Sequence, residues 1–189
     1  MPSPAVRIRL ATPDDAAAVA AIYRPYVDDT AVSFELEPPS EDEMRGRIAR
    51  VLERAPWVVV EWDGVVRGYA YGTRHRDRAA YDWTIETTVY VDPAFRGRGL
   101  GRAAMSALLD VLRRQGFHLA VAGITQPNPG SEGLHRALGF ERVGEFQAIG
   151  WKLGEWHGVE WFGVELGPRS EAPSPIRPVV DAAAEAGLG

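Results

Sequence analysis

The chain contains no cysteine, and this absence removes several classes of chemistry. Disulfides, thiol nucleophiles and cysteine-ligated metals are excluded. No apolar run approaches the about 18 residues that a membrane-spanning helix needs. No charged start followed by an apolar core marks a secretion signal. We therefore expect a cytoplasmic protein that works without a metal and without a membrane.

Positive charge is also in short supply. The 21 Lys and Arg against 26 Asp and Glu leave a net charge of −5, and the basic residues are scattered. Nucleic-acid-binding domains usually carry a basic patch, so no nucleic-acid partner is expected. The 189 residues, 46% of them hydrophobic, suit one domain with a sizeable core. We assign residues 1–167 to that domain and expect 168–189, rich in Pro and Ala, to be a poorly ordered tail.

Hydrophobic periodicity, caps and turn residues predict alternating strands and helices. Strands are expected at 6–10, 57–62, 65–71, 81–91, 117–124, 140–147 and 159–166, and helices at 12–27, 40–55, 103–114 and 128–139. The resulting order, β-α-α-β-β-β-α-β-α-β-β, predicts an α/β (α+β) protein of about seven strands and about four helices.

The most informative segment follows the expected strand that stops at Asp92-Pro93. A loop with three glycines leads into the amphipathic helix, and three arginines (Arg96, Arg98 and Arg102) lie in or next to it. Backbone N–H groups converge at such a helix start, and the helix dipole favours an anion there. The spacing is neither G-x-x-x-x-G-K-[ST] nor G-x-G-x-x-G. The plain alternative is a strand–turn–helix corner whose glycines serve only steric needs.

The loop Arg96-Gly97-Arg98-Gly99-Leu100-Gly101 resembles the Arg-x-x-Gly-x-Gly acyl-CoA loop of the GNAT superfamily of N-acetyltransferases. The predicted element order agrees with the topology of that superfamily. The resemblance implies a mixed, mostly antiparallel central sheet and acetyl-CoA as the co-substrate, with no metal.

A carboxylate in the strand before this loop is the best candidate for a catalytic base. Glu86 lies in the middle of Tyr81-Asp82-Trp83-Thr84-Ile85-Glu86-Thr87-Thr88-Val89, where β-branched and aromatic residues dominate. Carboxylates are rare in the middle of such strands, so the presence of Glu86 there indicates a functional role. The alternative is a solvated glutamate on the outer face of the sheet.

The segment from Tyr81 to Val91 also resembles the signature strand of phosphinothricin N-acetyltransferases, in which the mid-strand glutamate is the base. Ala31-Val32-Ser33-Phe34, Leu134-His135-Arg136-Ala137-Leu138-Gly139-Phe140 and Gly150-Trp151-Lys152-Leu153-Gly154-Glu155-Trp156-His157 fit the same family. The resemblance implies acetylation of the α-amino group of a small amino-acid analogue, such as phosphinothricin or methionine sulfoximine. It further implies direct attack in a ternary complex, a homodimer, and a role in antibiotic or herbicide resistance.

Carried over by position, the resemblance implies a complete site. Glu86 and His135 would be catalytic, although His135 would either protonate the leaving thiolate or pack near the cofactor. The cofactor would be held by Val89, Val91, Arg96, Gly97, Arg98, Gly99, Gly101, Arg102, Asn128 and Ser131. The acceptor would be held by Phe34, Arg76, Arg78 and Tyr81. Arginine suits an acceptor with carboxylate and phosphinate groups because it binds such anions in a bidentate manner.

Two other functions compete with this one. The enzyme would acetylate another small amine or amino acid, or the chain would be a non-catalytic acyl-CoA sensor. A sensor is expected to keep the glycine loop and to lose the base, whereas Glu86 is present. The tryptophans Trp151, Trp156 and Trp161 would line a dimer contact or belong to the core.

Overall fold

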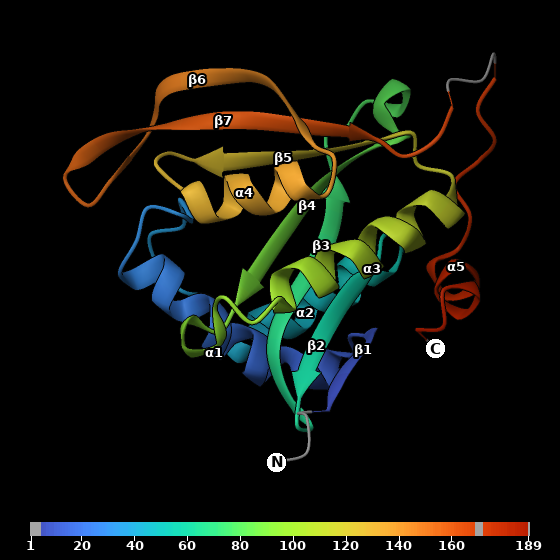
Figure 1. Ribbon diagram of the computed structural model, residues 1–189, viewed down its shortest axis with the longest axis horizontal. Coiled ribbons are helices and arrows are strands. Elements are labelled where there is room, and N and C mark those ends of the chain that lie inside the picture. The colour runs from blue at the N-terminus through green and yellow to red at the C-terminus, as the bar shows by residue number, and fades with distance from the viewer. Residues whose placement is uncertain (1–4, 169–171, 189) are drawn as a thin grey trace.

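A computed structural model describes residues 5–168 and 172–188. Seven strands form one sheet in the order β1-β2-β3-β4-β5-β7-β6 (Figure 1). The strands are β1 (Val6–Leu10), β2 (Trp57–Trp62), β3 (Val65–Arg74), β4 (Thr84–Val91), β5 (Leu119–Thr125), β6 (Glu141–Lys152) and β7 (Glu155–Glu165). Neighbouring strands are antiparallel except β4 and β5, which run parallel. The expected mixed, mostly antiparallel sheet is confirmed.

Helices cover both faces of this sheet. The helices are α1 (Ala16–Asp28), α2 (Glu41–Leu52), α3 (Leu100–Gln115), α4 (Pro129–Ala137) and α5 (Val179–Glu185). Because side chains alternate along a strand, Val58 and Val60 pack into the core on the α3 side, and Trp57 and Val59 pack under α1 and α2. The two faces therefore hold two separate cores.

Strands β4 and β5 separate after a short shared start. They pair only from Thr84 to Glu86 on β4. Strand β4 stays paired with β3 as far as Val91, while β5 diverges from it (Figure 1). Beyond Glu86, the edge of β4 that faces β5 has no strand partner within the described part of the chain. The sheet thus contains a wedge-shaped opening with Glu86 at its vertex.

The C-terminal segment corrects our expectation of a poorly ordered tail. Residues 169–171 and 189 lie outside the described residues, but 172–188 contain α5, whose Ala182 and Ala183 are fully buried in the core beside α3. The buried Gln115 side chain donates to the Arg177 carbonyl at 2.9 Å, which ties the segment to the end of α3. The spacing of Val179, Ala182 and Ala183 is an amphipathic pattern that the Pro- and Ala-rich composition conceals.

Two boundaries near the opening also differ from expectation. Strand β4 begins at Thr84, and Tyr81 lies before it in a short 3-10 turn, Ala79–Tyr81. Helix α3 begins at Leu100, three residues earlier than expected, because Gly99 adopts a left-handed conformation (φ 82°) and caps the helix. The glycine loop therefore ends directly at the first turn of a helix.

Candidate active site

Glu86 occupies the vertex of the opening because of the alternation along β4. Its neighbours Ile85 and Thr87 point into the sheet face covered by α3 and are buried. Glu86 points to the opposite face and keeps 29% of its side chain exposed. A partly exposed carboxylate at the point where two strands separate is within reach of a ligand in the opening.

His75 binds this carboxylate, and our sequence reasoning missed it. Its Nδ1 lies 2.7 Å from Glu86 Oε1. The side chain of Arg76 approaches the same oxygen at 3.7 Å. The pairing register of β3 and β4 explains the contact. Thr73 pairs with Glu86, so the residues just after β3 lie beside the Glu86 carboxylate. A prediction of that register would have identified His75.

The four predicted acceptor residues are only partly brought together. Arg76 reaches Glu86, and the Tyr81 ring lies 5.9 Å from the ring of His75. Phe34 lies in the loop after α1 and packs so closely on Gly150 of β6 that a Cβ there would overlap its ring. Arg78 is exposed, and its side chain makes no hydrogen bond or ion pair with the residues described here.

A cavity of about 330 Å³ opens on the same sheet face as Glu86. Thr73, the register partner of Glu86, forms part of its wall. The remaining lining consists of aromatic, apolar and arginine side chains from α1, α2, β2 and β3, namely Tyr23, Met44, Arg47, Arg50, Val51, Trp57, Tyr69 and Tyr71. None of the four predicted acceptor residues lines it.

The glycine loop presents backbone amides at the other end of the opening. Gly97 and Gly99 have positive φ angles of 73° and 82°, and the space beside both is open. Gly99 has no side chain with which to cap α3, so the N–H groups of the first turn stay available for an anion. These are the features of a phosphate site.

The arginines of the loop are held by aromatic rings. The Arg96 guanidinium lies 4.9 Å from the ring centre of Tyr26. Arg98 lies 5.2 Å and 5.3 Å from the ring centres of Phe95 and Trp62. Arg102 is exposed in the first turn of α3. Cation–π contacts orient a guanidinium without neutralising its charge, so these groups remain able to attract phosphates.

The loop packs tightly against β4 and α4. A Cβ on Gly101 would contact Val91 and Leu134 side-chain atoms at 3.4 Å. The Tyr26 hydroxyl donates to the Val91 carbonyl at 2.5 Å, which anchors the end of the open edge to α1. Beside Val91, the open edge contains Val89, so both predicted backbone positions border the opening.

Asn128 is the N-cap residue of α4, and His135 lies on that helix. The Asn128 Oδ1 caps the helix by accepting from the Ser131 N–H at 3.1 Å. His135 is 3% exposed, and its Nδ1 donates to the Ser131 carbonyl at 2.8 Å. Its buried Nε2 has no partner among the described residues, and burial lowers the pKa of the ring. The neutral ring therefore carries its only proton on Nδ1, and Nε2 is an acceptor.

These parts fit a CoA thioester. The α3 start and its arginines suit a pyrophosphate, and the open edge of β4 offers backbone partners to an amide-containing arm. The carboxylate lies where the arm would end. No cluster of His, Asp and Glu that would hold a metal occurs within residues 5–168 and 172–188. Fold and site together define an acyl-CoA-dependent acyltransferase.

Comparison with known proteins agrees. The chain matches the Acetyltransferase (GNAT) family over residues 18–140. A phosphinothricin N-acetyltransferase of Streptomyces viridochromogenes is 41% identical over 174 residues, 92% of this chain and 93% of that protein. An L-methionine sulfoximine/L-methionine sulfone acetyltransferase of Salmonella typhimurium is 37% identical, covering 84% of this chain and 94% of that protein.

A solved structure gives the same result. The crystal structure of a GNAT superfamily phosphinothricin acetyltransferase from Sinorhizobium meliloti, in complex with AcCoA, is 34% identical with a TM-score of 0.85. The match covers 92% of this chain and 98% of that one. The chain belongs to the GNAT acetyltransferase family. It is an acetyl-CoA-dependent N-acetyltransferase, which confirms the enzyme class and co-substrate expected from the sequence.

No helix among the described residues is long and apolar enough to cross a membrane.

Proposed function

We propose that the chain transfers the acetyl group of acetyl-CoA to the α-amino group of phosphinothricin or of a related small amino-acid analogue such as methionine sulfoximine. The observation that carries this proposal is the partly exposed Glu86 carboxylate at the vertex of the opening. The names of the relatives from Streptomyces and Salmonella support this class of acceptor. Detoxification of such compounds in the cytoplasm, and hence resistance to them, is part of the same proposal.

Proton balance defines the role of Glu86. An amino acid arrives as an ammonium ion, and only the neutral amine attacks a thioester. Glu86 takes one proton from the ammonium, which leaves the neutral amine free to attack the thioester carbonyl. As the C–N bond forms and the C–S bond breaks, the nitrogen gives up its second proton, and the departing thiolate takes it up. Because the His135 ring has no proton on Nε2, we assign it a packing role rather than that of an acid.

We assign the co-substrate to the predicted cofactor residues. The first turn of α3 and the loop Gly97–Gly99 bind the pyrophosphate, and Arg96, Arg98 and Arg102 add charge. Backbone groups at Val89 and Val91 run beside the pantetheine arm, and a strand amide polarises the acetyl carbonyl. On α4, Ser131 lies nearby, and the Asn128 amide nitrogen bonds the arm, since its oxygen caps the helix.

The acceptor is proposed to lie between Phe34, Arg76, Arg78 and Tyr81. The position of Arg76 beside Glu86 supports this, because a guanidinium there attracts the acidic groups of the acceptor and not a cationic polyamine. The cavity next to Thr73 provides room for the acceptor side chain. This placement lets one end of the acceptor be held by charge while its amine faces Glu86.

We further propose a homodimer formed through the β6–β7 hairpin. Six large apolar side chains on this hairpin are at least half exposed: Val143, Phe146, Ile149, Trp151, Leu153 and Trp156. Exposed apolar groups gathered on one element are typical of an interface. Sedimentation of the double variant Trp151→Ser, Trp156→Ser tests this: we expect a shift from dimer to monomer, and an unchanged dimer would contradict it.

CoA release by the purified protein tests the function. Acetyl-CoA is supplied with phosphinothricin, methionine sulfoximine, ordinary amino acids or polyamines. We expect turnover on the first two to exceed turnover on all others. Activity only on other acceptors would overturn the acceptor class and leave the transferase. Binding of acetyl-CoA without release of CoA on any acceptor would favour a sensor.

A further inference from the structure

We propose that His75 is a positioning residue for the Glu86 base: its Nδ1–H holds one carboxylate oxygen so that the other is presented to the acceptor amine. This inference rests on the proposed function, in which Glu86 takes a proton from that amine.

The contact has the geometry that positioning requires. An ionised carboxylate only accepts, so at 2.7 Å the His75 Nδ1 is the donor and Glu86 Oε1 the acceptor. Arg76 approaches the same oxygen at 3.7 Å. Oε2 has no hydrogen-bond partner within the part of the chain that the structure describes. The two carboxylate oxygens are therefore distinguished, with one held by protein and one left for substrate.

The imidazole is itself fixed by aromatic neighbours. Tyr81 and Trp161 meet the ring edge-on, with centroid distances of 5.9 Å and 6.0 Å. Only 19% of the His75 side chain is exposed. A ring wedged between two others has few orientations available, so its hydrogen bond restricts the Glu86 side chain with little further entropic cost.

The charged and titratable groups around this pair come from several elements. Glu86 faces the ring from β4, Arg76 from the loop after β3 and Tyr81 from the turn before β4. Trp161 of β7 adds no charge. The Tyr71 hydroxyl on β3 also interacts electrostatically with Glu86. A donor directed at Oε1 orients the carboxylate and leaves Oε2 to accept the proton.

The test compares His75→Phe, which keeps a ring and loses the donor, with His75→Asn, which keeps a donor near the Nδ1 position. His118→Phe is the matched control, because that ring bonds the Gly167 carbonyl and takes no part in the site. For each variant, kcat and KM for both substrates are measured across pH, and thermal melting checks the fold.

We expect His75→Phe to lower kcat by about tenfold to hundredfold, the cost of a misplaced catalytic group. The KM for acetyl-CoA is expected to stay within about twofold, because a change of that size is under about 0.5 kcal/mol. His75→Asn should recover part of the lost kcat. His118→Phe should match the wild type.

The outcomes separate this inference from the proposed function. If the wild type is active, Glu86→Gln is slow and His75→Phe matches the wild type in kcat, the positioning role alone is overturned. If the wild type releases no CoA with any acceptor, the proposed function falls and this inference falls with it. If Glu86→Gln keeps full activity, the transferase function stands, but Glu86 is not its base and this inference falls. Nitrogen NMR of the imidazoles checks the contact itself: the hydrogen-bonded Nδ1 signal of His75 should disappear in Glu86→Ala, which removes the acceptor, and an unchanged signal would overturn the contact.

Discussion

The polar side chain of β4 at the opening and the buried polar side chains of α4 and β6 are held in opposite ways. Glu86 stays partly exposed and uses one oxygen for His75, which leaves the other for a ligand. His135 and Lys152 are buried and donate to backbone carbonyls. Glu86 keeps one oxygen free to accept a proton from a ligand in the opening. The buried His135 and Lys152 instead donate their hydrogen bonds to backbone carbonyls and so hold chain segments together.

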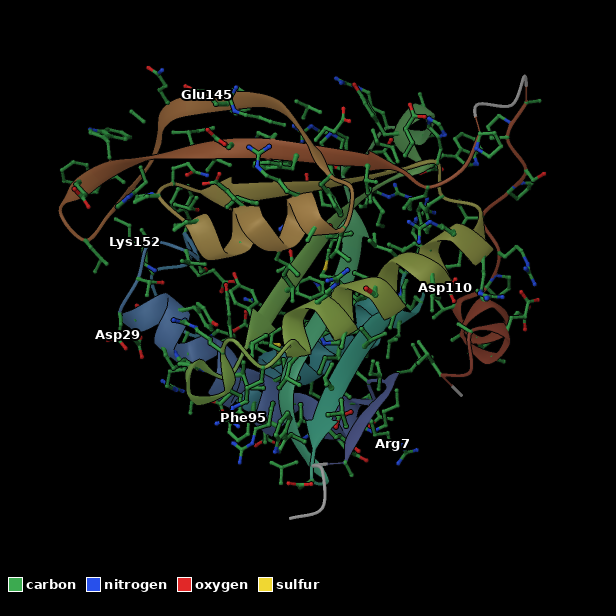
Figure 2. The ribbon with its side chains drawn as sticks, viewed as in Figure 1. Arg7, Asp29, Phe95, Asp110, Glu145 and Lys152 are labelled. Carbon is green, nitrogen blue, oxygen red and sulfur yellow. The ribbon has the colours of Figure 1, made fainter. Side chains whose placement is uncertain are left out.

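Lys152 shows what such a buried group does. It lies at the end of β6, beside the loop that follows α1 (Figure 2). Its Nζ donates to the carbonyls of Val27 at 2.6 Å and Ser33 at 2.7 Å. Burial lowers the pKa of the Lys152 ammonium, and Asp28 and Glu35 partly offset this effect. The hairpin is thereby fastened to the loop that carries Phe34.

The substitution Glu86→Gln should have the largest effect on catalysis, because it removes the carboxylate that accepts the proton. Glutamine keeps the shape of the side chain and cannot accept a proton as a carboxylate does. We expect kcat to fall by about 10²–10⁴-fold, the usual contribution of a general base. Acetyl-CoA affinity, measured by calorimetry, should stay unchanged because the glycine loop lies at the other end of the opening. Wild-type turnover in this variant would remove Glu86 from the mechanism.

The difference between the accessible Glu86 and the buried polar side chains could be predicted only in part from the sequence. Periodicity, caps and turn residues predicted the strands and helices, and the glycine loop predicted a phosphate site, because these depend on local pattern. Glu86 was singled out as a carboxylate among β-branched and aromatic residues, and the mixed sheet was implied by the family resemblance. His75 was missed because its role follows from the pairing of Thr73 with Glu86, which is non-local. The burial of His135 and the docking of α5 likewise depend on tertiary packing that one sequence does not display.

Lys152→Met should give the next largest effect, on stability. It leaves the Val27 and Ser33 carbonyls without their donor, which we expect to cost about 1–3 kcal/mol of unfolding free energy. Relief of a buried charge offsets part of this loss. Urea unfolding measures the change, and the acceptor KM should rise because the loop of Phe34 is loosened.

Arg142→Met on the same strand is the control for Lys152→Met. Its ion pairs with Glu145 and Glu160 are partly exposed, so a loss below about 1 kcal/mol is expected. Equal destabilisation by both substitutions would show that Lys152 has no special structural role.

In contrast to Glu86→Gln, the substitution His135→Asn should hardly change kcat. Asparagine can still donate to the Ser131 carbonyl and has no ring to titrate. We expect kcat to change by less than about threefold, equivalent to under about 0.7 kcal/mol in the barrier. Steady-state kinetics beside a melting curve measures this. A hundredfold loss in a folded variant would instead identify His135 as the acid for the thiolate.

Acid pH should lower the stability of the wild type through the same histidine. Burial lowers the pKa of His135 from 6.5, and its bond to the Ser131 carbonyl offsets this only in part. Below pH 6.5 the unfolded chain therefore binds a proton that the folded chain resists, so acidification favours unfolding until the folded ring is protonated too. The loss is limited to about 1.4 kcal/mol per pH unit. Urea unfolding on both sides of this pH should show the wild type losing stability relative to His135→Asn on the acid side. Parallel pH dependence of the two proteins would mean that the His135 ring takes up a proton as easily in the folded chain as in the unfolded chain. His135 would then resemble the accessible Glu86 rather than the buried Lys152.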